Sequence, residues 1–361
     1  MIRVLQITSK LFRGGAESFI MNVYRNIDHN RFQFDFLVFH SEREYYEEEI
    51  TRFGGNVYHV PVMEGMNFLN RKKMIDDFFK SHHNYDAVHC HMEALGNECL
   101  SAAEKFGIPC RISHSHIASF EHNLRGCAKR LFGLNFGKHA TLRLACSTLA
   151  GQYMYGKKSF VVLKNGIDAN RFCFDEEKRA LFRKENHLSE EEYVIGHVGR
   201  FELMKNHRFL IDVFSKMLSQ GFSGKLVLAG DGSLRSEIER QVHSLGIDQS
   251  VVFLGVIDNM DSFYSGIDIF VMPSLFEGLP FSAIEAQCAG LPCVLANTIS
   301  GECKLSSHVQ YLPLDAGGQT WATEIMKIRK NRYDGISLIR SSGYDIHDVV
   351  SVLEMYYEGC K

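Results

Sequence analysis

The stretch "IDIFVMPSLFEGLPFSAIEAQCAGLP", residues 267–292, reads as a strand, a turn and a helix in succession. The apolar run "IDIFVMPS" predicts a buried strand, and Gly and Pro mark the turn after it. The turn carries Glu277, and the first turns of the predicted helix carry Glu285. Acids near a helix N-terminus stabilise the helix by about 0.3–1 kcal/mol. The alternative is a ligand that spans this helix N-terminus and offers hydroxyl groups to both carboxylates.

The same alternation of short apolar strands and amphipathic helices extends along the whole chain. One series of strand-like runs comprises "RVLQIT", "FDFLVFH", "VYHV", "DAVHCH", "CRISHSH", "LRLACS" and "SFVVLKNGID". A second series starts near residue 193 with "YVIGHVG", "GKLVLAG", "VVFLG", "IDIFVMPS" and "PCVLA". Strands buried on both faces and joined by helices predict parallel, doubly wound sheets of the α/β class, here in two domains. The boundary is expected near residues 165–190, where the charged segment 175–192 reads as a connector and surface helix.

Composition excludes several classes of protein. A chain of 361 residues can form two domains, and its net charge of −3 gives no basic excess that would predict binding to nucleic acid. Ten cysteines without any C-x-x-C pair predict reduced thiols rather than a zinc site or a disulfide framework. The N-terminal "MIRVLQITSK" leads directly into a strand, and no run of about 18 apolar residues occurs. We therefore expect no signal peptide, no membrane span and a cytoplasmic protein.

Ligands of open α/β sheets bind beyond the carboxyl ends of the strands, so the residues that follow each strand are candidates for a site. After the first strand, Gly14 and Gly15 precede a helix that opens near Glu17. Such a turn is either an ordinary connection or a place where the backbone approaches an anionic ligand.

Two histidine pairs follow later strands of the first domain, His89 with His91 and His114 with His116. In each pair the side chains share one face of the strand, because residues two apart point the same way. A metal site is one interpretation, but the pairs lie on different strands and lack closely spaced Cys, Asp or Glu partners. We favour a single histidine that positions a substrate.

In the second domain, Arg200 and Lys205 lie between the strand "YVIGHVG" and the next helix. They are either solvated surface charges or ligands for a phosphate or diphosphate. The carboxyl edge of the same sheet carries Glu277 and Glu285, whose carboxylates suit hydroxyl-rich groups such as a ribose and a hexose. Together these residues predict a site for a nucleotide-sugar. No D-x-D motif occurs in the chain, so we expect a metal-independent site without a cofactor.

Four motifs in order give the chain a resemblance to the retaining glycosyltransferases of family 4, which have the GT-B architecture of two facing Rossmann-like domains with a cleft between them. "GGAE" (14–17) resembles the first glycine loop of that family, and "VVLKNGIDANRF" (161–172) its interdomain segment. "GHVGRFELMKN" (196–206) resembles its phosphate loop, and "FEGLPFSAIEAQCAGLPCV" (276–294) its Glu-x7-Glu signature. Among subfamilies, "RISHSH" resembles bacterial enzymes of capsule and exopolysaccharide assembly.

The resemblance implies a hexosyltransferase and a role for each residue of the second domain. Glu277 would hold hydroxyls of the transferred sugar, Glu285 the ribose hydroxyls, and Arg200 with Lys205 the diphosphate. The donor site would also include Gly278 and Leu279. The donor is expected to be UDP-linked, and retention of the anomeric configuration is implied by the resemblance alone.

The resemblance also assigns parts to the first domain, residues 1–168, as the acceptor side. Gly15 would let the backbone approach the reaction centre, and the active-site histidine falls on His114 or His116, with His116 favoured because it lies further past the strand. Residues 169–344 would bind the nucleotide-sugar. A C-terminal helix, about 345–361, would cross back to the first domain on an apolar stripe of Val349, Val352, Leu353 and Tyr356.

Three alternatives compete with this interpretation. An NAD-dependent Rossmann enzyme would need G-x-G-x-x-G after the first strand, and "RGGAES" lacks that spacing. A nucleotide-sugar 2-epimerase of the same architecture would act without an acceptor. A non-catalytic sugar-binding protein is disfavoured by the intact set of Glu277, Glu285, Arg200 and Lys205.

The acceptor is expected to be a saccharide, and the resemblance to polysaccharide enzymes implies one linked to a lipid diphosphate. Residues 111–160 carry many cations against a single acid, Glu121, mixed with apolar residues in "LRGCAKRLFGLNFGKHA" (124–140). The pattern fits either a core-packed helix with a solvated basic face or a surface that contacts an anionic inner membrane from its cytoplasmic side. The cations are Arg111, Arg125, Lys129, Arg130, Lys138, Arg143, Lys157 and Lys158; the apolar residues are Leu124, Leu131, Phe132, Leu134 and Phe136.

Overall fold

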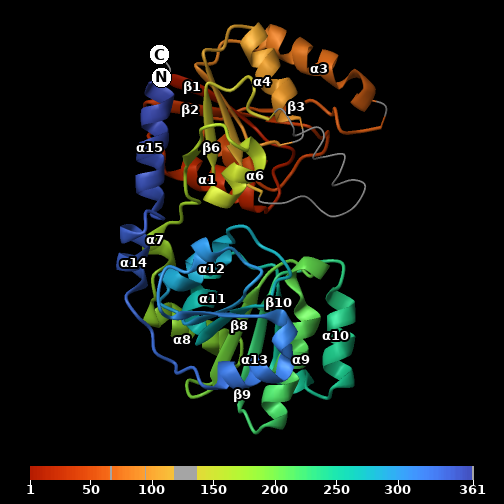
Figure 1. Ribbon diagram of the computed structural model, residues 1–361, viewed down its shortest axis with the longest axis vertical. Helices are drawn as coiled ribbons and strands as arrows, with labels where there is room; N and C mark the ends of the chain where they lie inside the picture. The colour runs from red at the N-terminus through yellow and green to blue at the C-terminus, as the bar shows by residue number, and fades with distance from the viewer. Residues whose placement is uncertain (66, 94, 118–135, 360–361) are drawn as a thin grey trace. The chain divides into compact units, whose positions relative to one another are not determined.

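The computed structural model describes residues 1–65, 67–93, 95–117 and 136–359, and the chain forms two compact units (Figure 1). The first unit comprises Met1–Gly166 with Ile346–Lys361, and the second comprises Ile167–Asp345. The division falls two residues before the expected boundary at 168/169. Each unit holds one parallel sheet, so the predicted α/β class with two doubly wound sheets is confirmed.

The sheet of the first unit has the strand order β3-β2-β1-β4-β5-β6-β7, and its paired strands are parallel. The order reverses direction between β1 and β4, which makes the carboxyl ends of these two strands the topological switch point where ligands of such sheets bind. The strands are β1 Ile2–Ile7, β2 Phe32–Val38, β3 Val57–His59, β4 Ala87–Cys90, β5 Cys110–Ser115, β6 Leu142–Ala145 and β7 Val161–Val162. The helices are α1 Gly15–Asn26, α2 Glu47–Arg52, α3 Asn67–Ser81, α4 Gly96–Lys105, α6 Thr148–Tyr155 and α15 Ile346–Glu358.

The sheet of the second unit has the order β10-β9-β8-β11-β12-β13 and is also parallel, with its switch point between β8 and β11. The strands are β8 Tyr193–Val198, β9 Gly224–Ala229, β10 Val251–Gly255, β11 Ile269–Met272, β12 Cys293–Ala296 and β13 Val309–Leu312. The α-helices are α7 Ala169–Phe172, α8 Glu176–Glu185, α9 His207–Ser219, α10 Arg235–Ser244, α11 Met260–Gly266, α12 Phe281–Cys288, α13 Gly317–Met326 and α14 Gly335–Ser341. Short 3-10 turns occur at η1 Leu203–Lys205, η2 Asp248–Ser250, η3 Gly301–Cys303 and η4 Leu314–Ala316.

The last helix, α15, belongs to the first unit and packs against α1 and β1. In Figure 1, α15 therefore runs alongside the start of the chain at β1. The apolar stripe predicted for this helix is wrong in part, because Val352 and Tyr356 are only partly buried. The buried face runs instead through Ile346, Val349, Val350, Leu353 and Tyr357, which are spaced three or four residues apart with one extra contact at Val350.

The charged segment 175–192 is more than the expected connector. Its helix α8 packs against α11 within the second unit, and Arg183 is fully buried with 0% exposure. The Arg183 guanidinium donates to Asp268 Oδ2 at 2.8 Å and to the carbonyl of Gly266 at 2.9 Å. A buried charge is tolerated when it is paired and hydrogen-bonded in this way. Composition alone points to the surface, and no local signal distinguishes Arg183 from its solvated neighbours.

The cysteines follow the expected pattern with one exception. Free thiols in the described part of the chain are Cys90, Cys99, Cys146, Cys173, Cys288, Cys293 and Cys303. Cys110, at the start of β5, is disulfide-bonded, which the cysteine spacing does not predict.

Candidate active site

The switch point of the second unit brings Lys205 and Glu277 into direct contact. Lys205 ends the η1 turn after β8, and Glu277 lies in the loop after β11, the neighbouring strand. The Lys205 Nζ atom lies 2.6 Å from Glu277 Oε1, with the two side chains 21% and 18% exposed. The amide of Leu275 donates to the carbonyl of Met204 at 2.8 Å, which ties the two loops together. A cation and a carboxylate that are both accessible at a switch point can bind a ligand with anionic and hydroxyl groups.

Glycines at the ends of β8 and β9 make room for Lys205. A Cβ atom on Gly199 would lie 2.9 Å from Lys205 Cδ, so the aliphatic stem of this lysine runs directly over the glycine. Gly230 has a φ of +130°, and a Cβ there would lie 2.1 Å from the Gly199 carbonyl oxygen. Only glycine fits at position 230, because of its positive φ and the nearby backbone, whereas a Cβ at position 199 would displace the stem of Lys205. Sequence reasoning places Lys205 in the site but misses Gly199 as the residue that lets it reach the site.

Glu285 occupies a more buried position in α12, four residues after Phe281, the first residue of that helix. Burial raises the pKa of Glu285 to about 7, although the hydroxyl of Tyr264 and the charge of Arg171 act in the opposite direction. Tyr264 Oη donates to Glu285 Oε2 at 2.8 Å, which leaves the other carboxylate oxygen available. Tyr264 is a neighbour of the site that sequence reasoning missed, because it lies on α11 with no motif around it.

The other predicted residues of the second unit differ in accessibility. Arg200 is exposed just beyond β8, and Gly278 is partly exposed in the turn that carries Glu277. Leu279 is only 8% exposed and packs into the hydrophobic core of the unit. Its side chain is therefore structural, and a ligand could meet only its backbone.

Gly15 lies at the switch point of the first unit, where it begins α1 after β1. A Cβ atom on Gly15 would meet nothing within 4 Å, whereas one on Gly14 would lie 2.3 Å from Glu17 Oε2. Packing within the unit therefore explains Gly14 but not Gly15. An exposed glycine without a packing reason fits a place that a ligand approaches.

The two histidine pairs meet in one cluster, because β4 and β5 are adjacent strands with His89 opposite Ile112. The pairs do lie on different strands, but these strands are neighbours, so their separation in the sequence does not argue against a metal. The ligand atoms of His89, His91 and His114 lie within 4.8 Å of one another, close enough to surround an ion. The ring nitrogens, however, are hydrogen-bonded to one another: His89 Nε2 lies 3.2 Å from His114 Nδ1, and His91 Nδ1 lies 2.8 Å from His116 Nε2.

Burial separates the two candidates for the active-site histidine. His114 is 0% exposed in the middle of the cluster, whereas His116 lies just after β5 and is only partly buried. Burial lowers the pKa of His116 to about 3 and that of His114 well below its ordinary value, so both rings are neutral at pH 7. Of the two rings, His116 is therefore the more exposed, although its Nδ1 atom is buried.

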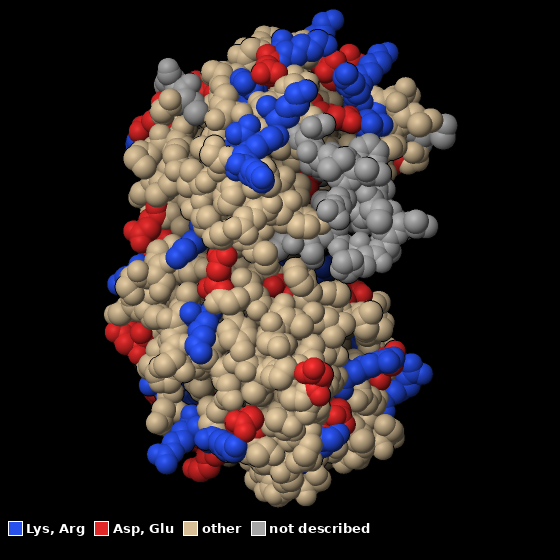
Figure 2. All heavy atoms as spheres, viewed as in Figure 1, with Lys and Arg blue, Asp and Glu red and all other residues tan. Residues whose placement is uncertain are grey.

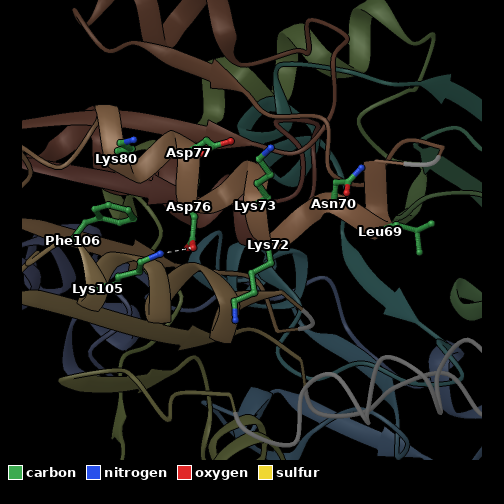
Figure 3. A pocket seen from close by; sticks show the side chains of 9 residues that line it. All are labelled: Leu69, Asn70, Lys72, Lys73, Asp76, Asp77, Lys80, Lys105 and Phe106. Atoms are coloured by element: carbon green, nitrogen blue, oxygen red, sulfur yellow. Dashed lines mark hydrogen bonds and ion pairs between the residues drawn. The ribbon is translucent and has the colours of Figure 1, made fainter.

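A separate hollow of about 580 Å³ lies between α3 and the end of α4 and contains none of the predicted site residues (Figure 3). It is lined by lysines and acids, and Lys105 Nζ lies 2.7 Å from Asp76 Oδ2 across it. Lys72, Lys73 and Lys80 form no ion pair among the described residues. Lys and Arg side chains gather over this part of the first unit in Figure 2. Solvated side chains of this kind form a charged surface rather than a catalytic pocket.

A basic, membrane-contacting surface is expected at residues 111–160, but residues 118–135 lie outside the described chain, so only the rest of this region can be compared with the structure. Two of its members are committed to other contacts. Arg111 binds Glu104 and donates to the carbonyls of Ile108 and His139. Phe136 is 1% exposed and stacks on Tyr155, so it is not available as a membrane anchor. No helix in the described part of the chain is long and apolar enough to cross a membrane.

Comparison with known proteins identifies the family. A family model described as "Glycosyl transferases group 1" matches residues 178–312. The glycosyltransferase EpsF of Bacillus subtilis (strain 168) is 33% identical over 374 residues, which cover 98% of this chain and 96% of EpsF. The UDP-Gal:alpha-D-GlcNAc-diphosphoundecaprenol alpha-1,3-galactosyltransferase of Escherichia coli is 27% identical over 235 residues, 62% of this chain and 61% of that enzyme. The crystal structure of Anabaena HepE in complex with UDP has a TM-score of 0.81 at 18% identity and covers 99% of this chain and 100% of that one.

Two parallel Rossmann-like units, each with its candidate residues at the switch point, define the GT-B fold. The chain belongs to the group 1 glycosyltransferases and is a transferase. This membership does not favour the NAD-dependent and non-catalytic alternatives.

Proposed function

We propose that this protein transfers a hexose from a UDP-linked sugar to a saccharide acceptor, and that the second unit binds the donor at its β8/β11 switch point. The observation that carries the proposal is the accessible Lys205–Glu277 pair, with its 2.6 Å contact, at that point of the sheet. Lys205 and Arg200 would neutralise the diphosphate, Glu277 would hold hydroxyls of the transferred sugar, and Glu285 would hold those of the ribose. Gly278 and the backbone of Leu279 would complete the donor site.

The chemistry follows from where charge develops. The bond between the anomeric carbon and the diphosphate oxygen breaks, a bond to the acceptor hydroxyl oxygen forms, and the hydroxyl proton passes to the departing diphosphate. The leaving diphosphate gathers negative charge, which Lys205 and Arg200 stabilise if they are already in position. We propose that these cations do this without a metal or another cofactor, and that the anomeric configuration is retained. We propose Gly15 and His116 as the functional residues of the first unit.

The acceptor class is supported by the comparisons rather than by a pocket. The E. coli relative is named for transfer to a sugar on diphosphoundecaprenol, which is a lipid-linked acceptor. We propose a similar saccharide acceptor, linked to a lipid, in the assembly of a surface polysaccharide. Peripheral contact with an anionic membrane would bring the enzyme to such an acceptor. Among the described residues, exposed lysines that could make that contact are Lys72, Lys73 and Lys80 of α3 and, in the region 111–160, Lys138, Lys157 and Lys158.

The proposed function is tested by incubating the protein with a panel of UDP- and GDP-sugars and measuring release of the nucleotide with and without a lipid-linked saccharide. We expect release that requires a UDP-sugar and increases strongly with the acceptor. Equal release without acceptor would support the 2-epimerase alternative instead. Binding of NAD but no nucleotide-sugar would overturn the proposal.

Membrane contact is expected to depend on the lysines of α3. The triple variant Lys72→Glu, Lys73→Glu, Lys80→Glu should lose most of its co-sedimentation with anionic vesicles at low salt, because each lysine near such a surface contributes about 1 kcal/mol. The matched control replaces three exposed lysines of the second unit, Lys184, Lys304 and Lys327. Wild-type protein that binds neutral and anionic vesicles equally would refute an electrostatic contact.

UDP is expected to bind more tightly at pH 8 than at pH 6, by up to about tenfold. The carboxyl of Glu285, whose pKa burial raises to about 7, must be ionised to accept hydrogen bonds from the ribose hydroxyls. Binding therefore releases protons near pH 7, which isothermal titration in buffers of different ionisation heat measures directly. Glu285→Gln should bind weakly at both pH values. A pH-independent affinity of the wild-type protein would contradict the assignment of Glu285.

A further inference from the structure

Asn206 has an unusual backbone conformation for a residue other than glycine. It lies between the η1 turn and α9, with φ at 56° and ψ at 41°, which is the left-handed region. In the described chain, the one other non-glycine residue with a positive φ is His187. Few side chains tolerate this conformation, although asparagine does so more readily than most. Residues held in this way gather at functional sites, where the surrounding structure compensates for the backbone strain.

The conformation of Asn206 separates two helical segments that would otherwise run together. The η1 turn ends at Lys205, and α9 begins at His207. The amides of Phe209 and Leu210 donate to the Asn206 carbonyl at 3.1 and 3.3 Å, so α9 begins directly after this residue. A right-handed helical residue at 206 would instead continue η1 into α9 and turn the Lys205 side chain with it. The left-handed residue therefore sets the direction in which Lys205 leaves the loop.

The side chain of Asn206 is used differently from that of an ordinary helix cap. An N-cap asparagine usually accepts a hydrogen bond from an amide of its own helix. Here Asn206 Nδ2 donates to the carbonyl of Pro273, the residue after β11, at 3.1 Å. A carbonyl oxygen can only accept, so the amide nitrogen of Asn206 faces Pro273. Glycine would allow the same backbone conformation but could not make this contact.

Asn206 is the last of three consecutive residues that contact the segment after β11. The Met204 carbonyl accepts from the Leu275 amide at 2.8 Å, and Lys205 Nζ lies 2.6 Å from Glu277 Oε1. The contacts of Met204 and Asn206 thus flank that of Lys205. All of them lie within the second unit, where β8 and β11 are neighbouring strands. The backbone from which Lys205 extends is therefore tied to the β11 segment on both sides.

We infer that Asn206 is a positioning residue that holds Lys205 beside Glu277, where its charge meets the departing diphosphate. The inference rests on the proposed function, in which Lys205 stabilises that diphosphate. Asn206 acts through its left-handed backbone and its hydrogen bond to Pro273, and not on the donor itself. A misplacement of about 1 Å at a preorganised site can lower a rate by about 100-fold. Losing the contacts of Asn206 should therefore slow catalysis without removing a group that binds the donor.

Two variants of Asn206 separate the backbone from the side chain. Asn206→Gly keeps the left-handed conformation but loses the hydrogen bond to Pro273, and we expect kcat to fall about 10-fold. Asn206→Ala loses the hydrogen bond and also disfavours the backbone conformation, so kcat should fall about 100-fold. The KM for the UDP-sugar should change by less than about threefold in both variants, because the charge of Lys205 is used mostly in the transition state. Normal kcat in both folded variants would overturn the inference.

Combination with Lys205→Ala tests whether Asn206 acts through Lys205. If it does, adding Asn206→Gly to Lys205→Ala should lower kcat little further, because the residue that it positions is already absent. The two losses are then strongly non-additive, which is the sign of residues that act together. Fully additive losses would overturn the inference, since they would show an effect of Asn206 that is independent of Lys205.

His187→Ala is the matched control for the backbone change. His187 has a φ of 55° and is exposed just after α8 in the same unit, away from the residues of the candidate site. Alanine imposes a similar backbone cost at both positions, so His187→Ala and Asn206→Ala should lose similar amounts of thermal stability. Only Asn206→Ala should lose kcat. Equal losses of kcat in the two variants would assign the effect to general destabilisation and overturn the inference.

Crystal structures of the Asn206 variants give a readout that needs no substrate. We expect the contact between Lys205 Nζ and Glu277 Oε1 to lengthen in Asn206→Gly and to exceed about 4 Å, the limit of an ion pair, in Asn206→Ala. An unchanged contact in both variants would overturn the inference. If Asn206→Ala fails to fold, Asn206→Gly decides the question in both measurements. If the wild-type protein turns over no nucleotide-sugar, the proposed function fails, whereas these structures still show whether Asn206 holds Lys205 in place.

Discussion

Replacing Lys205 with alanine is expected to lower kcat by about 100- to 1000-fold, the effect of removing one preorganised stabiliser of a developing negative charge. Lys205 lies 2.6 Å from Glu277 at the switch point of the second unit and remains partly accessible. Its charge would be used most in the transition state, when the diphosphate departs, so the loss should fall on kcat more than on KM. Glu277→Ala should lower turnover by a similar factor, because it removes a ligand of the transferred sugar and leaves Lys205 without its partner.

The stability of both variants should be nearly normal, since a partly exposed ion pair contributes only about 0–1 kcal/mol. Lys327→Ala is a matched control, because Lys327 Nζ forms an ion pair of the same 2.6 Å length with Glu324 on the surface of the same unit. Steady-state kinetics with circular dichroism as the check on folding distinguish the two lysines. Near-normal turnover in folded Lys205→Ala would show that this lysine does not act on the diphosphate.

The first unit is expected to lose several kcal/mol of stability between pH 6.5 and pH 5. Its buried histidines are neutral when folded, and burial lowers the pKa of His89, for example, to about 3. Above about pH 6.5 neither the folded nor the unfolded chain protonates these rings, so stability is unaffected there. Below that pH the histidines are protonated in the unfolded chain but not in the folded chain. Each such histidine then lowers the free energy of unfolding by about 1.4 kcal/mol per pH unit, until the pH reaches its pKa in the folded chain. With His91 and His114 equally buried, the combined loss approaches the whole stability of a typical domain.

Chemical unfolding at a series of pH values measures this loss. His89→Gln should reduce the slope of the unfolding free energy against pH by about 1.4 kcal/mol per pH unit near pH 5, because one fewer proton is taken up on unfolding. The exposed His243→Asn should leave the slope unchanged. A wild-type slope near zero between pH 6.5 and pH 5 would contradict this prediction. It would mean that the folded chain protonates these histidines as readily as the unfolded chain does.

The sheets could be predicted from the sequence because their strands are buried on both faces. Such strands appear as short apolar runs in the sequence. The predicted strands that precede Arg200, Glu277 and His116 agree with the observed strands to within two residues at each end. Because the carboxyl ends of parallel strands lie at the same edge of a sheet, Arg200, Lys205 and Glu277 are expected at one edge of one sheet. The motifs of the second unit carry this information locally, which is why sequence reasoning succeeds there.

Contacts between distant parts of the sequence could not be predicted in the same way. Gln6 and Tyr357 are 351 positions apart, and no spacing rule links them. The burial of Arg183 depends on Asp268, which approaches it only after α8 packs on α11. The stripe predicted for α15 is right at Val349 and Leu353 and wrong at Val352 and Tyr356, because the neighbouring elements decide which face of the helix is buried.

The return of α15 to the first unit has a consequence for biosynthesis. This helix follows the entire second unit in the sequence, so a ribosome completes Ile167–Asp345 before it makes the segment that packs on α1 and β1. The second unit is continuous and can fold as it emerges, whereas the first must wait with part of its apolar surface uncovered. The nascent first unit is therefore the part of the molecule that most needs protection from aggregation, and a chain that stops short of Tyr357 would leave that protection permanently incomplete.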